Sequence, residues 1–235
     1  MDIYLLAFGN SGNPTVLKHV TYGGVSSYMA VPSGEYTVAM RAVGASASSP
    51  PIVSTNFMVS GGTNYTVASL GPAAARRLEV LKDAMAAPKG QVLVRVIQAS
   101  LKEHQVTVTY GSDTLASKLA FGSATGYKTL PAGSDTVKFS SSGGNTSAPA
   151  SLAADTVHTI VVLDGSNGLE VDNLTDAAGS QVAASGGAAT GFGGTAPRPA
   201  DTLPWLLTMT GGVLLALAGW ASLRRTRGTR TGAAQ

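Results

Sequence analysis

Two stretches of the sequence decide the fold: VTYGGVSSYMAVPSGEYTV at residues 20–38 and LAFGSATGYKTLPAGSDTV at residues 119–137. They match at one constant offset of 99 residues. The matched pairs are Tyr22 with Phe121, Gly23 with Gly122, Tyr28 with Tyr127, Pro32 with Pro131, Gly34 with Gly133, Thr37 with Thr136, and Val38 with Val137. Composition alone does not produce such a set, so the chain contains a tandem duplication.

The match continues on both flanks of these stretches, with small insertions. Residues 64–67 (NYTV) pair with residues 157–160 (VHTI), and residues 78–80 (LEV) pair with residues 169–171 (LEV). We therefore expect a first unit at residues 1–87 and a second at residues 91–176. Each is long enough to form one small core.

Within each unit the pattern is typical of β-strands. The runs VLVRVIQAS (92–100), VTVTYG (106–111) and HTIVVLDG (158–165) are rich in β-branched residues and bounded by turn-forming ones. The one helix-like stretch, residues 75–89, contains the LEV segment whose partner is strand-like, so we predict a closing strand there. The pattern predicts an all-β fold of two tandem Ig-like antiparallel β-sandwiches.

The first unit differs from the second at its beginning. The second unit carries VLVRVIQAS before its VTVTYG strand, whereas the first opens at Met1, already at the equivalent of VTVTYG. The first strand of the first unit is therefore expected to be missing, which would expose a sheet edge and part of a core. One hypothesis explains this and the lack of a signal peptide: Met1 is an internal methionine. Tail-anchored insertion with a cytosolic β-domain is the competing hypothesis.

Residues 203–223, LPWLLTMTGGVLLALAGWASL, contain no charged residue. A helix of this length would span roughly 30 Å, the thickness of the hydrocarbon core of a bilayer. We therefore predict a single transmembrane helix that binds the lipid bilayer. Its predicted membrane-anchoring residues are Trp205, Trp220, Arg224, Arg225 and Arg227.

The charges around this segment predict its orientation. Tryptophan favours the membrane interface, and the arginines after Leu223 predict a cytoplasmic tail at residues 224–235, with the N-terminal units outside the cell. The ending also resembles the sorting signal of Gram-positive surface proteins, but Leu203-Pro204 is followed by Trp205-Leu206-Leu207 in place of the residues that a sortase cleaves. A retained single-pass anchor is the favoured interpretation.

Composition restricts the remaining possibilities. Residues 177–202 are almost all small residues, Gly and Pro, which predicts a flexible stalk between the second unit and the membrane. The formal net charge is +3, but four arginines lie in the tail, which leaves 12 basic against 13 acidic residues before it. Nucleic acid is therefore not an expected partner. The chain has no cysteine, which excludes disulfides and cysteine-ligated metals.

Several of these residues together resemble the bacterial DUF4397 domain family, whose members are exported, often duplicated β-sandwich modules. The resemblance rests on VRVIQAS (94–100), the DIYL strand (2–5), Tyr22-Gly23 with Phe121-Gly122, and the Tyr-x-x-x-Pro-x-Gly motifs that begin at Tyr28 and Tyr127. It implies a β-sandwich fold over roughly residues 1–175 and no catalytic residue. The second unit reads QASLK at residues 98–102, where the family usually has a His and an Asp-containing loop.

No residue pattern indicates catalysis, a cofactor or a metal. The histidines, His19, His104 and His158, are not spaced as metal ligands, and a structural role on a strand is expected for His158. No GxSxG motif occurs, so we predict no enzyme. Tyr22, Tyr28, Phe121 and Tyr127 are expected to fill the sandwich cores rather than to bind a glycan or peptide.

The sequence thus predicts a non-enzymatic, single-pass cell-membrane protein that displays two β-sandwich modules outside the cell. Its expected role is structural or adhesive, with an envelope polymer or a surface protein as partner. The alternative is an envelope receptor or enzyme with a site between the two units. Convergent polar groups in an interdomain cleft would favour the receptor.

Overall fold

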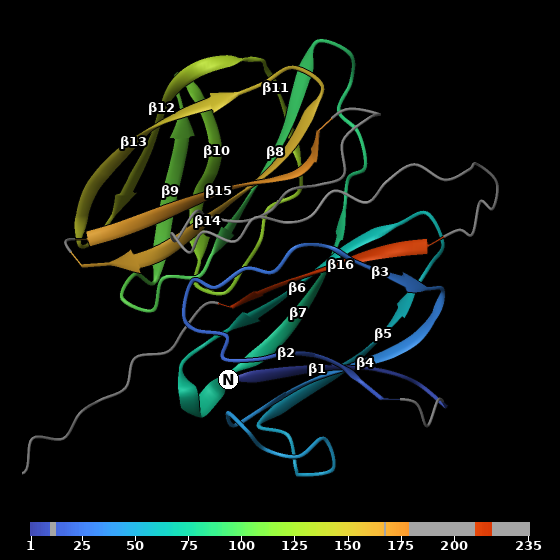
Figure 1. Cartoon of the computed structure of the whole chain (residues 1–235). Helices are drawn as coiled ribbons and strands as arrows, with labels where there is room; N and C mark the ends of the chain where they lie inside the picture. The colour runs from blue at the N-terminus through green and yellow to red at the C-terminus, as the bar shows by residue number, and fades with distance from the viewer. Residues whose placement is uncertain (10–12, 167, 179–209, 218–235) are drawn as a thin grey trace, which may run out of the picture.

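The computed structural model describes residues 1–9, 13–166, 168–178 and 210–217, and apart from one short turn of 3-10 helix (η1, Ala73–Ala75) its elements are β-strands (Figure 1). The strands form four sheets of four strands each. Two sheets belong to each repeat and face each other across a hydrophobic core, as in a β-sandwich. The predicted all-β architecture is therefore confirmed.

The first repeat consists of one sheet with the strand order β2–β1–β4–β5 and a second sheet with the order β3–β16–β6–β7. The strands are β1 (Asp2–Ala7), β2 (Thr15–Leu17), β3 (Met29–Pro32), β4 (Gly34–Arg41), β5 (Val53–Val59), β6 (Asn64–Leu70), β7 (Arg77–Asp83) and β16 (Thr210–Leu217). The prediction that residues 78–80 lie in a closing strand is confirmed by β7.

The second repeat has the same topology, with the strand orders β10–β9–β12–β13 and β11–β8–β14–β15. The strands are β8 (Gln91–Gln98), β9 (Gln105–Tyr110), β10 (Asp113–Ala120), β11 (Lys128–Pro131), β12 (Gly133–Ser141), β13 (Gly144–Leu152), β14 (Thr156–Gly165) and β15 (Gly168–Ala178). Strand for strand, β8 holds the place in this repeat that β16 holds in the first. The shared topology agrees with the tandem duplication.

Residues 210–217 form strand β16, not the helix predicted over residues 203–223. β16 pairs antiparallel with β3 and parallel with β6, and it fills the place that we expected to be empty in the first repeat (Figure 1). An uncharged apolar run has no periodicity that separates a buried strand from a membrane helix, so the sequence does not exclude either. The rest of residues 203–223 lies outside the described residues. Within the described part of the chain, no helix has the length and apolar character needed to cross a bilayer.

The two repeats pack against each other through the sheets that contain β6 and β14. Along β14 the side chains alternate: Ile160 and Val162 lie in the core of the second repeat, whereas Val161 and Leu163 lie in a separate apolar cluster shared by both repeats. That shared cluster also includes Ala68 and Leu70 of β6. Strands that are buried on both faces read as nearly continuous apolar runs, which explains HTIVVLDG and VLVRVIQAS.

The register of the sheets corrects one predicted pairing of the repeats. β6 pairs with β7 so that Ser69 lies opposite Leu78, and β14 pairs with β15 so that Val162 lies opposite Val171. Because Ser69 and Val162 are equivalent, Leu78 is equivalent to Val171 and not to Leu169. The offset between the repeats is therefore 93 residues in this hairpin, against the predicted 91.

Candidate functional site: a buried polar cluster between the repeats

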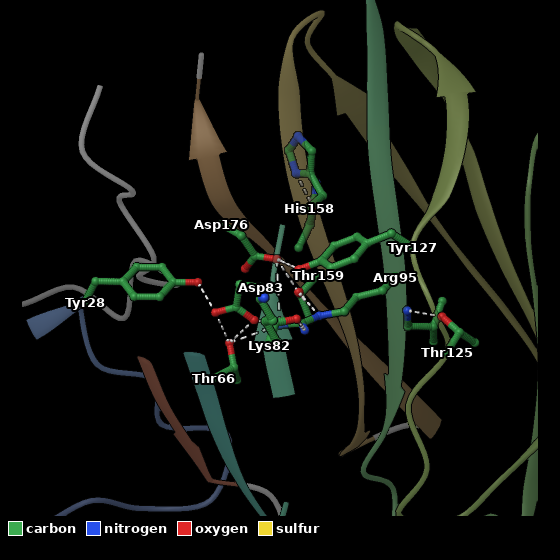
Figure 2. Close-up of polar contacts among 12 residues, drawn as sticks. Tyr28, Thr66, Lys82, Asp83, Arg95, Thr125, Tyr127, His158, Thr159 and Asp176 are labelled. Carbon is green, nitrogen blue, oxygen red and sulfur yellow. Dashed lines mark hydrogen bonds and ion pairs between the residues drawn. The ribbon is translucent and has the colours of Figure 1, made fainter. Parts of the chain in front are cut away.

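A cluster of polar side chains lies between the repeats (Figure 2), and one of its members, Tyr28, packs against the shared apolar cluster. We call this polar cluster the Arg95 cluster, and its members come in equivalent pairs around one arginine. They are Tyr28 with Tyr127, Thr66 with Thr159, Asp83 with Asp176, and Arg95. The threonines lie on β6 and β14 and the aspartates at or near the ends of β7 and β15, so the duplicated topology brings both sets to one place.

Arg95 connects the two repeats. Its Nη2 atom donates hydrogen bonds to Oδ1 of Asp83 at 2.6 Å and to Oγ1 of Thr66 at 3.0 Å, both in the first repeat. Its Nε atom donates to Oγ1 of Thr159 in its own repeat at 2.7 Å. The side chains of Arg95 and Asp83 are 3% and 0% exposed, so this ion pair is shielded from water.

The two carboxylates are held by equivalent hydroxyl groups. Tyr28 donates to Oδ2 of Asp83 at 2.6 Å, and Tyr127 donates to Oδ2 of Asp176 at 2.9 Å. The Tyr127 ring also lies under the Arg95 guanidinium, 4.9 Å from centroid to Cζ. Such charge-assisted hydrogen bonds and cation–π contacts are strongest where water is excluded.

Asp176 is less well satisfied than Asp83. Its Oδ2 atom accepts from Thr159 at 2.5 Å and lies 3.8 Å from Nη2 of Arg95, but its buried Oδ1 atom has no hydrogen-bond partner among the described residues. Burial raises the pKa of Asp176 to about 6, because the cost of desolvating the carboxylate outweighs the attraction of Arg95.

The pKa values of the two tyrosines and of Arg95 are also shifted. Burial, reinforced by the neighbouring carboxylates, raises the pKa of the Tyr28 and Tyr127 phenols. Burial favours a lower pKa for Arg95, but Asp83, Tyr127 and Asp176 together raise it. At neutral pH the cluster therefore holds protonated phenols and a charged guanidinium.

A second polar group fastens a loop of the second repeat. Asp164 accepts hydrogen bonds from Oγ of Ser100 at 2.5 Å and from the backbone N–H groups of Leu101 and Lys102. The Tyr22 hydroxyl accepts from the backbone N–H of Asp164 at 2.6 Å, which joins the first repeat to this loop. Burial raises the pKa of Tyr22 to about 12.

An open pocket of 360 Å³ lies on the second repeat, away from the Arg95 cluster. Its lining includes His104, Thr107, Lys118 and Ser140. His158 does not approach it, since its ring bonds Thr156 and Asn173 beside its own strand. Within the described residues, no group of three or more His, Asp or Glu side chains is arranged to hold a metal ion.

Some of the residues singled out in the sequence lie outside the described residues, and others lie elsewhere than predicted. The predicted anchoring residues Trp205, Trp220, Arg224, Arg225 and Arg227, and residues 179–202 of the predicted stalk, lie outside the described residues; residues 177 and 178 end β15. The expectation that Tyr22, Tyr28 and Tyr127 fill the sandwich cores is wrong. Tyr22 and Tyr28 pack against the shared apolar cluster between the repeats, and Tyr127 donates a hydrogen bond to Asp176 in the Arg95 cluster.

Sequence reasoning missed Arg95, Asp83 and Asp176. A signal for them exists, because Arg95 is the one charged residue in the apolar strand VLVRVIQ. An arginine at the centre of a strand buried on both faces requires a carboxylate partner. At the correct offset of 93 residues, Thr66 matches Thr159 and Asp83 matches Asp176.

Comparison with protein-family models gives two overlapping matches to one family, described as a domain of unknown function, DUF4397. The matches cover residues 1–109 and 92–190, so together they span residues 1–190 of the 235 in the chain. No curated protein matches the chain. The two matches agree with the duplicated sandwich, and the chain belongs to the DUF4397 family.

Proposed function

We propose that this protein is a non-enzymatic surface protein that presents its two β-sandwiches as one rigid body outside the cell membrane. The observation that carries the proposal is the Arg95–Asp83 ion pair, which joins the repeats at a point closed to water. Contacts to an envelope polymer or a partner protein would then be made by the loops and sheet edges of a body of constant shape.

The energetics of the interface support rigidity. Separating the repeats would expose the shared apolar cluster and leave the charge of Arg95 or Asp83 without its partner. Exposing the apolar cluster to water is unfavourable, because buried apolar surface contributes roughly 25 cal/mol per Å² to stability. Inter-repeat motion of that kind is therefore rare, and the pair of repeats acts as a spacer of fixed length.

The same contacts argue against a ligand site at the centre of the interface. A receptor needs a cavity in which polar groups remain free to bind a ligand. Here the polar groups converge and most of them bond to one another, and Tyr28 also packs against the apolar cluster that contains Ala68, Leu70, Val161 and Leu163. This supports a structural role over the alternative of a receptor or enzyme with a site between the repeats.

Membrane attachment through residues 203–223 is the second part of the proposal. Residues 210–217 cannot lie in β16 and in a membrane helix at the same time. Without lipid, pairing with β3 and β6 satisfies their backbone groups, whereas in a bilayer a helix spanning all 21 uncharged residues satisfies them internally. The arginines after Leu223 favour a cytoplasmic tail.

The test uses the absence of cysteine from the chain, which makes any introduced thiol unique. Met58→Cys places a thiol at an exposed position of the first repeat, and Thr231→Cys places one in the tail. In intact native cells, a membrane-impermeant maleimide should label the Met58→Cys variant only, and after lysis it should label both. Labelling of the tail in intact cells, or release of the protein by an alkaline carbonate wash, would contradict the proposal.

A further inference from the structure

β16 occupies its sheet in the same register as β8 occupies the equivalent sheet of the second repeat. Val94 lies opposite Lys128 of β11 and His158 of β14, and Val213 lies opposite the equivalent residues, Met29 of β3 and Tyr65 of β6. Both neighbours therefore align residue 213 with residue 94. One position further along, Arg95 lies opposite Thr159, and Leu214 lies opposite Thr66.

The Arg95 cluster is thus symmetric in all its parts but one. Tyrosine, threonine and aspartate each occur twice at equivalent positions, whereas Arg95 has Leu214 as its counterpart. Two buried carboxylates, Asp83 and Asp176, consequently share one guanidinium.

The atom left unsatisfied is the one that a second arginine would reach. Arg95, from the second repeat, donates to Oδ1 of Asp83 in the first repeat. Because the two repeats contribute equivalent residues to the cluster, an arginine at the position of Leu214 is expected to donate to Oδ1 of Asp176, a buried oxygen that has no hydrogen-bond partner in the described part of the chain. The raised pKa of Asp176 agrees with a missing positive charge.

We propose that the place between β3 and β6 is an exchangeable strand-binding site, whose preferred occupant is an extended polypeptide segment of β8 type with an arginine opposite Thr66. The inference rests on the proposed function, because residues 210–217 leave this site when residues 203–223 enter a bilayer. Their departure exposes the N–H and C=O groups of β3 and β6 and one side of the first core, which a donated strand covers.

The occupant is defined by three features of the site. It runs antiparallel to β3 and parallel to β6, as β16 does. Apolar side chains are needed at alternate positions to cover the core that contains Val31 and Val67. Asp83 and Asp176 face only one guanidinium, that of Arg95, among the described residues. An arginine in the bound strand supplies a second positive charge, whereas an apolar residue at that position supplies none.

The test uses the full chain in lipid nanodiscs and a fluorescent peptide with the sequence of residues 90–100, GQVLVRVIQAS. We expect saturable binding in an anisotropy titration. A peptide with leucine in place of the arginine should bind about 10–100-fold more weakly, the loss that corresponds to a charge-assisted hydrogen bond of about 1.5–3 kcal/mol. Equal binding of both peptides, or no binding of either, would overturn the inference.

A locked variant provides the matched control. Ala30 of β3 lies directly opposite Gly212 of β16, so Ala30→Cys combined with Gly212→Cys can form a disulfide that holds β16 in place. The oxidised variant keeps β16 in its sheet and cannot insert residues 210–217 into the bilayer, so in the presence of nanodiscs it should not bind the peptide. Peptide binding by the oxidised variant equal to that of the wild-type chain would show that the peptide binds elsewhere and would overturn the inference.

The same cysteine pair separates failure of the exchange from failure of membrane anchoring. If the reduced variant is placed in nanodiscs and then oxidised, anchoring predicts that no disulfide forms. Disulfide formation there would overturn both proposals, because β16 would have remained in its sheet. No disulfide together with no peptide binding would overturn only the strand-binding site.

The charge argument is tested separately, without lipid, by Leu214→Arg. With β16 in place, the new arginine should lower the pKa of Asp176, measured by NMR titration of its carboxyl carbon, whereas Leu214→Met should not. An unchanged pKa in Leu214→Arg would overturn the assignment of this position to an arginine.

Discussion

The Nη2 atom of Arg95 lies 2.6 Å from Oδ1 of Asp83, and this ion pair helps to join β8 of the second repeat to β7 of the first. Both side chains are almost completely buried. In so dry a position an ion pair contributes specificity of docking more than net stability, because the cost of desolvating two charges offsets much of their attraction. Removing one partner of the pair nevertheless destabilises the fold strongly, because the other charge stays buried without a counter-charge.

Replacing Arg95 by leucine should therefore lower the free energy of unfolding by about 3–5 kcal/mol at neutral pH, because Asp83 and Asp176 would be left without a cation. Chemical denaturation followed by circular dichroism measures the loss. The matched control is Lys128→Leu, which removes the exposed Lys128–Asp113 pair and should cost less than about 1 kcal/mol. Equal losses in the two variants would contradict a special role for the buried pair.

Asp176 should make the protein less stable as the pH rises from about 4 to 6. The unfolded chain releases this proton near pH 3.8, whereas the folded protein keeps it up to about pH 6, so deprotonation favours unfolding over that interval. Deprotonation lowers the free energy of unfolding by about 3 kcal/mol; this loss is fully present above pH 6 and absent below pH 3.8.

The measurement compares denaturation of the wild-type protein and Asp176→Asn at several pH values. The stability difference between them should shift in favour of the variant as the pH rises through that interval and then stay constant. A difference independent of pH would show that Asp176 titrates normally in the folded protein.

Asp2 should show the opposite dependence. Its carboxylate accepts the backbone N–H groups of His19 and Gly44, each at 2.8 Å, and these hydrogen bonds lower its pKa. The stabilisation is present above pH 3.8 and is lost as the pH falls through the lower pKa of the folded state. Asp2→Asn should therefore be destabilised most near neutral pH and approach the wild-type protein in acid. A gap that widens in acid would refute this assignment.

Tyr28→Phe should cost more than Tyr36→Phe, although each removes one hydroxyl group. Tyr28 donates to the carboxylate of Asp83 at 2.6 Å, whereas Tyr36 donates to the neutral carbonyl of Pro32 at 3.0 Å. Hydrogen bonds to charged groups contribute about 1.5–3 kcal/mol and neutral ones about 0.5–1.5 kcal/mol. Thermal and chemical unfolding of the two variants gives the comparison, and a larger loss in Tyr36→Phe would reverse it.

Much of the fold could be predicted because strand patterns are local. The alternation and turn residues around Pro32 and Pro131 predict the same strands in both repeats, and the structure contains them as β3, β4, β11 and β12. The closing strand at residues 78–80 was also predictable, since its partner reads as a strand. These features depend on neighbours along the chain, which the sequence displays directly.

The Arg95 cluster could not be predicted from the LEV match at residues 78–80 and 169–171, which is shifted by two residues from the register of the sheet. In the first repeat, residues 71–76 with η1 replace the tip of the hairpin that β14 and β15 form in the second. The sheet register shows that this hairpin follows an offset of 93 residues, at which Asp83 corresponds to Asp176; the register shift in β15 leaves Asp176 without a direct partner on β14.

Local pattern was enough to establish the duplication, the strand-rich composition of both repeats and an uncharged apolar segment near the end of the chain. It was not enough to say what that segment pairs with, or which faces of the two sandwiches meet. Burial by lipid and burial by neighbouring strands both remove an apolar run from water, with a similar gain in free energy. A strand pattern, in turn, does not show what covers the second face of the strand. Contacts between residues far apart in the chain decided both: β16 completes the sheet of β3 and β6, and Arg95 finds its carboxylate in the other repeat.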